Sequence, residues 1–229
     1  ASRQQEQIQR LALSELHPFK DHPFRVLDDD RMMETVESVK EYGVLVPIIA
    51  RPMADGGYEI VSGHRRKRAC ELAGMNEIPA IVRDLDDDEA VIIMVDSNLQ
   101  RENILPSERA KAYQMKMEAI KRQGERVDLT SRQVGEKSQT SIQLVASQAG
   151  ESQRQVQRYI RLTELIPELL DMVDEKKIAL NPAYELSFLK KEEQRDLLDA
   201  MDSEQATPSL SQAQRLKKYS QEGHLTLDM

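Results

Sequence analysis

The fold is decided by Tyr58-Glu59-Ile60-Val61-Ser62-Gly63-His64-Arg65-Arg66-Lys67-Arg68-Ala69, where an apolar strand pattern meets a glycine and then a basic helix start. Gly63 can adopt a turn that residues with a Cβ atom avoid. Free backbone N–H groups at a helix N-terminus favour anions, and Arg65 and Arg66 add charge-assisted donors. The pattern indicates either a phosphate-binding turn or a solvated basic helix turn after a buried strand. It is not a Walker A loop, because no Gly-Lys-Ser/Thr follows.

The segments around this turn predict mixed helices and strands. Met32, Val36 and Val39 recur at helical spacing, so residues 31–42 read as an amphipathic helix that Gly43 ends. A loop is expected over residues 11–26 and a further helix over residues 64–73. Strands are expected at Val44–Pro52, Tyr58–Ser62 and Ile78–Val82, the first two joined by a turn at residues 54–57. The acidic run Asp86-Asp87-Asp88-Glu89 then fits a helix start better than a metal site.

After Pro106 only helical patterns follow. We expect a helix over residues 108–123 with Ser107 as its N-cap, and a short helix around residues 130–136. Residues 141–149, a turn at 150–152 and residues 153–165 then form two helices joined by a short turn. Their inward residues are Leu144, Val145, Val156, Tyr159, Ile160 and Thr163. The outer face of the second helix is left to Gln153, Arg154, Gln157, Arg158 and Arg161.

This layout is that of a helix-turn-helix, whose second helix enters the major groove of DNA. Gln and Arg are the side chains that read adenine and guanine edges. An ordinary αα-hairpin with a solvated basic face is the alternative. The distribution of charge favours DNA, since residues 109–165 carry 11 Lys and Arg against 6 Asp and Glu within a chain of net charge −8.

Composition excludes two classes of protein. The single Cys70 cannot form an intramolecular disulfide, and no run approaches the roughly 20 apolar residues of a membrane helix. The polar start of the chain does not resemble a signal peptide. We therefore expect a cytoplasmic protein with no membrane partner.

Three blocks together resemble the nucleotide-binding domain of the ParB family of DNA-partition proteins. They are Tyr42-Gly43-Val44-Leu45-Val46-Pro47-Ile48, Gly63-His64-Arg65-Arg66-Lys67-Arg68-Ala69 and Asp96-Ser97-Asn98-Leu99-Gln100-Arg101. The family reads roughly Gly-Val-Leu-x-Pro-Ile, Gly-Glu-Arg-Arg-x-Arg-Ala and Glu-Asn-x-Gln-Arg, followed by a helix-turn-helix. The resemblance covers about residues 8 to 190.

The resemblance implies an α+β N-terminal ParB/sulfiredoxin-like domain followed by an all-α helix-turn-helix domain. We expect a polar tail at residues 1–10, the nucleotide-binding domain at 11–104, and the DNA-binding domain at 105–202 with its helix-turn-helix at 141–165. Residues 203–229 would be a linker and C-terminal helix, with no separate dimerisation domain.

The resemblance also implies a CTP site. Gly43, Val44, Leu45 and Val46 would lie against the base, and Gly63, His64, Arg65 and Arg66 would hold the phosphates. Ser97, Asn98 and Arg101 occupy matching positions of the third block.

Two residues depart from the family pattern. The family usually has Glu where this chain has His64 and Ser97, and those carboxylates are tied to Mg²⁺ and to hydrolysis. A neutral His or Ser cannot replace a hard anionic ligand of Mg²⁺. Asp96 is the remaining candidate for a metal ligand or catalytic group, so we expect nucleotide binding with at most weak CTPase activity.

The function implied is that of a CTP-gated clamp or repressor. It would be a homodimer on palindromic double-stranded DNA, in chromosome or plasmid partition, associated with the nucleoid or a plasmid, with a ParA-type ATPase as partner. Two alternatives stay open. One is a helix-turn-helix transcriptional regulator with a degenerate nucleotide domain. The other is a nucleotide-dependent enzyme of the same superfamily, such as a free-amino-acid kinase or a sulfiredoxin-like reductase, although the turn lacks the reductase's cysteine.

Overall fold

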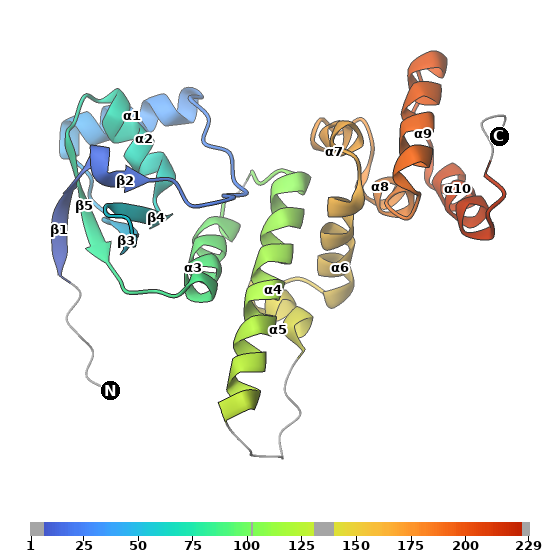
Figure 1. The fold of residues 1–229 in the computed structure, drawn as a ribbon. Helices are drawn as coiled ribbons and strands as arrows, with labels where there is room; N and C mark the ends of the chain where they lie inside the picture. Colours follow the sequence, from blue (N-terminus) through green and yellow to red (C-terminus); the bar gives the residue numbers. More distant parts are fainter. Residues whose placement is uncertain (1–6, 102, 131–139, 226–229) are drawn as a thin grey trace. The chain divides into compact units, whose positions relative to one another are not determined.

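The chain forms two compact units, shown in a computed structural model that describes residues 7–101, 103–130 and 140–225 (Figure 1). The first unit comprises the chain up to Arg101 together with Ala119–Thr130, and the second comprises Glu102–Glu118 and everything from Ser131 onward. Helix α4 (Pro106–Thr130) contributes one segment to each unit. Within the described part of the chain, no helix is both long enough and apolar enough to cross a membrane.

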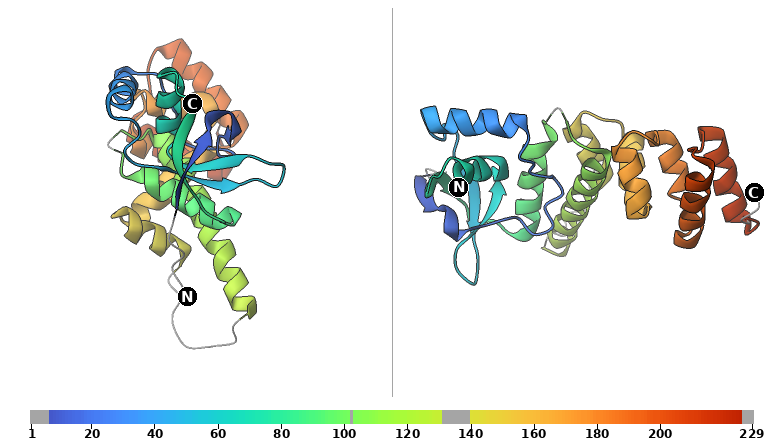
Figure 2. Two further views of the ribbon diagram at one scale, coloured as in Figure 1. Left: turned by 90° about the vertical axis from the view of Figure 1, so that its left-hand side faces the viewer. Right: turned by 90° about the horizontal axis from the view of Figure 1, so that it is seen from above.

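The first unit is built on a five-stranded mixed sheet in the order β1-β5-β3-β4-β2. β1 (Ile8–Ala12) runs antiparallel to β5 (Glu77–Val82), and β2 (Leu16–His17) runs parallel to β4 (Tyr58–Ser62). β3 (Ile48–Pro52) lies between β5 and β4, parallel to the first and antiparallel to the second. The hairpin of β3 and β4 extends from the sheet in both views of Figure 2.

Helices α1 (Asp30–Tyr42) and α2 (His64–Leu72) pack against each other beside the sheet. Met32 and Val36 of α1 are fully buried with Ile48, Ile60 and Ile78 of the strands, and these residues form the core of this unit. α3 (Asp87–Leu99) lies against β4. Asp86 is its N-cap in a capping box with Glu89, which confirms the interpretation of the acidic run as a helix start. The predicted strand at residues 58–62 and helix from residue 64 are also confirmed.

Two predictions about this unit are wrong. Residues 8–12 form β1 and residues 16–17 form β2, where we predicted a tail and a loop. β1 exposes Ile8, Gln9 and Arg10, so it shows no alternating pattern, and its hydrogen bonds to β5 determine its conformation. The strand predicted at Val44–Pro52 begins only at Ile48. Gly43, with φ 73° and ψ −169°, turns the chain after α1, and Leu45 and Val46 are exposed.

In the second unit the described residues form helices and no strand, so the predicted fold class is confirmed. After α4 follow α5 (Ser141–Ala149), α6 (Gln153–Arg161), α7 (Pro167–Asp174), α8 (Leu180–Leu186), α9 (Lys191–Glu204) and α10 (Leu210–Glu222). A 3-10 turn at Leu162–Glu164 follows α6, so that helix is shorter than predicted. Leu162, Leu169, Leu186 and Ala213 are buried in the core of this unit.

The start of α4 also differs from the prediction. Ser107 lies inside the helix, where its N–H and Oγ–H donate to the Asp174 carboxylate at 2.9 and 2.5 Å. Leu105 is the residue before the helix, and the Glu108 carboxylate accepts its backbone N–H at 3.1 Å, which is one half of a capping box. α4 continues through Thr130 rather than ending at residue 123. Apart from Thr130, the short helix predicted around residues 130–136 lies outside the described residues.

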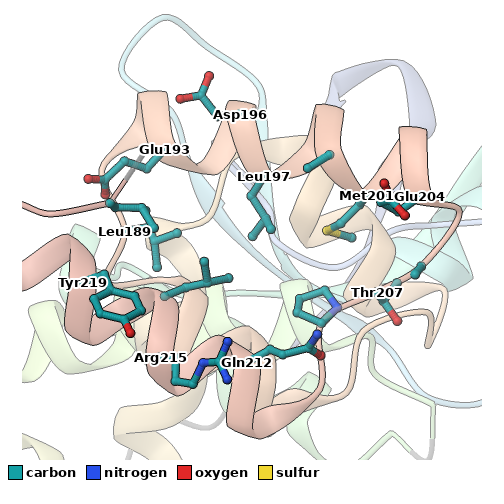
Figure 3. A pocket seen from close by; sticks show the side chains of 15 residues that line it. Leu189, Glu193, Asp196, Leu197, Met201, Glu204, Thr207, Gln212, Arg215 and Tyr219 are labelled. Carbon is teal, nitrogen blue, oxygen red and sulfur yellow. The ribbon is translucent and has the colours of Figure 1, made fainter. Parts of the chain in front are cut away.

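The C-terminal helix predicted within residues 203–229 is present as α10, and it packs into the helical core of the second unit. It packs against α8, where Lys217 donates to Glu185 at 2.9 Å, and Ser220 Oγ donates to Glu193 of α9 at 2.5 Å. Between α9 and α10 lies a pocket of about 530 Å³ (Figure 3). Its apolar lining includes Leu197, Met201 and Leu216.

Candidate functional site

The turn after β4 is fixed by Gly63. Its φ of 111° and ψ of 24° are left-handed, and α2 begins at the next residue. A Cβ atom at this position would lie 2.5 Å from Cγ2 of Ile48, so any larger residue would have to displace the β3 side chain. The first N–H groups of α2 have no carbonyl partner within the helix. The sequence therefore places a set of backbone donors at this turn.

His64, the first residue of α2, is held by the loop between β2 and α1. Its Nε2 accepts the backbone N–H of Phe19 at 3.2 Å, and its ring centroid lies 3.9 Å from that of His22. Burial lowers the pKa of His64 to about 3, with further contributions from the charges of His22 and Lys67. The neutral imidazole is the form that can accept the Phe19 N–H.

The arginines of this turn also have partners in the protein. Arg65 contacts the Asp29 carboxylate at 3.5 Å. Arg66 donates to the backbone carbonyls of Val46 and Pro47, each at 2.6 Å, and burial lowers its pKa. Arg66 therefore joins the second predicted block to the first, and it is less available to a phosphate than we predicted.

The predicted base-binding loop follows α1 directly. Gly43 is the C-cap of α1, with its N–H donating to the carbonyl of Val39. Val44 packs against the core, whereas Leu45 is 76% and Val46 62% exposed. The loop thus presents two apolar side chains and backbone groups to solvent, while Arg66 fixes its far end.

The third predicted block lies at the end of α3. Ser97 Oγ and Asn98 Nδ2 both donate to the carbonyl of Met94, and the Arg101 N–H donates to the carbonyl of Asn98. These bonds hold the block within its own helix and turn. Participation of Ser97, Asn98 and Arg101 in a nucleotide site remains a prediction.

The residues present do not fit a protein-held Mg²⁺ ion. His64 is neutral and accepts a backbone N–H, and the Ser97 hydroxyl donates to a carbonyl. Among the described residues, no group of three or more His, Cys, Asp or Glu side chains is arranged to hold a metal. Asp96 is an exposed carboxylate on α3 and belongs to no such group, so its role in metal binding or catalysis stays a prediction.

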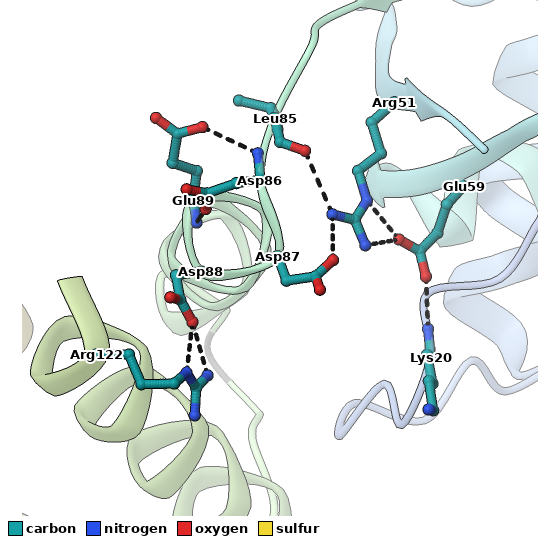
Figure 4. A network of polar contacts seen from close by, with 9 residues as sticks. All are labelled: Lys20, Arg51, Glu59, Leu85, Asp86, Asp87, Asp88, Glu89 and Arg122. Atoms are coloured by element: carbon teal, nitrogen blue, oxygen red, sulfur yellow. Dashed lines mark hydrogen bonds and ion pairs between the residues drawn. The ribbon is translucent and has the colours of Figure 1, made fainter. Parts of the chain in front are cut away.

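A partly buried ion network that we did not predict joins the same loop to the sheet (Figure 4). The Glu59 side chain is 8% exposed, and its carboxylate accepts from Arg51 Nε at 2.7 Å and from the Lys20 backbone N–H at 3.0 Å. Arg51 also pairs with Asp87 at 2.7 Å, at the start of α3. Two consecutive amides, those of Phe19 and Lys20, are thus held by side chains of α2 and β4. The available sequence signal was a charged residue, Glu59, within an otherwise mostly apolar strand.

Asp88, next in the acidic run, pairs with Arg122 at 2.7 Å within the first unit. Its side chain is 1% exposed, and the contact fastens the last part of α4 to α3 (Figure 4). The acidic run therefore provides a helix cap at Asp86 and two long-range ion pairs at Asp87 and Asp88.

In the second unit, the outer face of α6 is formed by its first half. Ser152 caps the helix by accepting the N–H of Gln155 at 3.1 Å. Gln153, Arg154 and Gln157 are exposed, as predicted. Arg158 is half-buried, with its guanidinium 5.8 Å from the centroid of the Tyr184 ring.

Arg161 does not lie on this outer face, and that part of the prediction is wrong. Its Nη2 donates to the carbonyl of Ser187 at 3.0 Å, and its guanidinium lies 4.3 Å from the Phe188 ring centroid. α8 packs against α6, and Ser187 and Phe188, which follow α8, contact Arg161 at the end of α6. Helical spacing alone cannot indicate such a neighbour.

Both parts of the chain match models of known protein families. Residues 1–99 match the model of the ParB N-terminal domain, and residues 130–222 match that of the ParB HTH domain. The chain belongs to the ParB family. The chromosome-partitioning protein Spo0J of Thermus thermophilus is 33% identical over 186 residues, which are 81% of this chain and 62% of that protein.

Other ParB-like proteins are similarly related. A nucleoid occlusion protein of Listeria monocytogenes is 32% identical over 190 residues, which cover 83% of this chain and 60% of the relative. The chain thus spans about three-fifths of the length of these two curated relatives. A C-terminally truncated ParB of Caulobacter crescentus, complexed to its centromeric parS site, has a TM-score of 0.53 at 24% identity, over 92% of this chain and 98% of that one. This likeness concerns the fold alone.

Proposed function

We propose that this ParB-family chain is a DNA-binding protein whose state on DNA is controlled by CTP. The observation that carries the DNA part is the exposure of Gln153, Arg154 and Gln157 at the start of α6, directly after α5 and a short turn. These side chains carry the amide and guanidinium groups that form paired hydrogen bonds with adenine and guanine. Arg158 and Arg161 contact α8 and the residues after it, so these two side chains hold α6 in place.

The nucleotide part rests on the Gly63 turn and on family membership. The turn offers backbone N–H groups and Arg65, and the adjacent Gly43–Val46 loop offers exposed apolar side chains with backbone donors and acceptors. CTP is the ligand that the family resemblance implies. We expect the nucleotide to act through binding with little hydrolysis, because neither His64 nor Ser97 supplies a carboxylate.

A homodimer on a palindromic site is the assembly that this function requires, since a two-fold protein matches two-fold DNA half-sites. In the cell, the complex would be associated with the nucleoid or a plasmid, with a ParA-type ATPase as the partner in segregation. Nucleotide would then favour the state in which two N-terminal units associate on DNA.

The DNA function is tested by selecting a binding site from a random duplex library and measuring affinity by fluorescence anisotropy. Arg154→Ala should weaken binding to the selected site by about 1–3 kcal/mol if Arg154 reads a guanine. Arg195→Ala is the matched control, because Arg195 is an exposed arginine on α9 and its loss removes the same charge. Equal losses in the two variants would show that the effect is electrostatic and that α6 does not read the site.

The nucleotide function is tested by calorimetry of the intact chain with CTP, ATP, GTP and UTP, each with and without the selected DNA. We expect preferential binding of CTP. A second candidate function, a helix-turn-helix regulator with a degenerate nucleotide domain, is favoured by the contacts that already occupy Arg66. Specific DNA binding without binding of any nucleotide would support that second function and exclude the first.

A further inference from the structure

The segment Pro18–Asp29 between β2 and α1, here called the strap, contacts the first two turns of α2 at several points. Phe19 and His22 meet His64, as described above. At the other end of the strap, Asp29 meets Arg65 and Asp28 meets Arg68. The strap therefore covers the same helix start that the proposed function assigns to the phosphates.

The two acidic contacts differ in strength. Asp28 accepts two hydrogen bonds from Arg68, at 2.5 and 3.0 Å, which is a strong paired geometry. Asp29 makes one contact with Arg65, at 3.5 Å, and both side chains are partly exposed. The Asp29 oxygen that faces Arg65 also accepts the N–H of Met32 at 2.9 Å, since Asp29 is the N-cap of α1. An exposed pair with such geometry contributes little stability and can exchange partners.

A phosphate oxygen is the same type of acceptor for a guanidinium as a carboxylate oxygen, and it carries comparable charge. We propose that Asp29 is an internal competitor for the nucleotide, whose carboxylate occupies Arg65 until a phosphate of the ligand replaces it. Asp29 thereby lowers the affinity of the site and limits it to ligands with enough phosphate charge to displace the pair. This inference rests on the proposed nucleotide function of the turn.

Asp29→Asn separates this role from the capping role. Asn is as good an N-cap as Asp, so α1 should keep its start while Arg65 loses its anionic partner. We expect Asp29→Asn to bind CTP about two- to fivefold more tightly than the wild-type chain, in line with the small contribution of exposed ion pairs. Calorimetry of the full chain measures this change, and circular dichroism checks that helix content is kept.

Asp28→Asn is the matched control. Asp28 is the neighbouring residue, and its substitution removes the same charge from a carboxylate that pairs with Arg68 rather than Arg65. It should change CTP affinity less than Asp29→Asn does. A second test uses Arg65→Ala, in which the gain from Asp29→Asn should disappear, because a competitor has no effect once its target is removed.

The outcomes separate this inference from the proposed function. If all the proteins bind CTP and Asp29→Asn shifts the affinity no more than Asp28→Asn, the inference is overturned and the nucleotide function stands. If none binds CTP, the nucleotide function fails, and a titration with inorganic tripolyphosphate tests Asp29 separately. Tighter tripolyphosphate binding by Asp29→Asn than by Asp28→Asn would support the inference; equal affinity, or no binding, would overturn it.

Discussion

His64 should make the stability of the N-terminal unit depend on pH in a way that His64→Gln removes. The pKa of His64 is about 3 in the folded chain, against an ordinary value of 6.5. Between these values the unfolded chain binds a proton that the folded chain excludes, so stability is complete above pH 6.5 and falls as pH decreases. Gln can still accept the Phe19 N–H through its side-chain oxygen but does not titrate.

The expected size of the effect follows from the distance below pH 6.5. Each pH unit contributes about 1.4 kcal/mol, so at pH 5 the wild-type chain should have lost about 2 kcal/mol through this residue. The Asp and Glu side chains are common to both proteins and cancel in the difference. His17→Gln is the matched control, because it removes an exposed histidine from β2 of the same unit and should follow the wild type.

The measurement must report on the first unit alone, since two units need not unfold together. Peptide-resolved hydrogen exchange of β3, β4 and β5 in urea, at pH 7.5 and pH 5, gives the unfolding free energy of that unit. A nuclear magnetic resonance titration of the His64 ring gives the pKa directly. Parallel losses of stability in wild type and His64→Gln, or a His64 midpoint near pH 6.5, would refute the reasoning.

Two further substitutions test the packing around the site and in the second unit. Gly63→Ala should destabilise the first unit by about 2–4 kcal/mol, because it adds left-handed strain and a clash with Ile48. Gly74→Ala is the control, since Gly74 has φ +73° and nothing lies within 4 Å of the new Cβ atom. It should cost only the backbone strain, about 1–2 kcal/mol. Equal losses in urea unfolding would rule out the clash. Gln194→Leu should destabilise the second unit by about 1–3 kcal/mol, since buried Gln194 accepts the Ile166 N–H at 2.7 Å and donates to the carbonyls of Glu164 and Leu189. Gln214→Leu, at an exposed position, is its control. Equal urea-unfolding midpoints in the two variants would contradict this account.

The elements that were predicted correctly are those whose signals are local. Gly63 after an apolar strand, the Gly56-Gly57 turn and the acidic start of α3 each act within a few residues, and the structure has all of them. The helix-turn-helix was also predictable from the sequence, because Gly150 and Ser152 separate two segments with helical periodicity.

The features that were missed depend on neighbours far away in the sequence. β1 is mostly exposed, and only its pairing with β5, about 70 residues later, makes it a strand. Phe19 and His64 are 45 residues apart, and Arg161 and Ser187 are 26 apart. No periodicity encodes such contacts, so the partners of the predicted site residues could not be assigned from sequence.

The same contacts explain how an acidic chain can carry two basic sites. Three cations of α2 are paired with carboxylates within the first unit: Arg65 meets Asp29, Lys67 meets Glu71, and Arg68 meets Asp28. The fourth, Arg66, donates to backbone carbonyls. A ligand that binds Arg65 must therefore compete with a carboxylate. On α6, by contrast, Arg154 extends into solvent among uncharged glutamines. If the two proposals hold, DNA phosphates approach an Arg154 that has no carboxylate beside it on α6, whereas a nucleotide exchanges with the Asp29 carboxylate. A rise in salt should then weaken DNA binding more steeply than nucleotide binding.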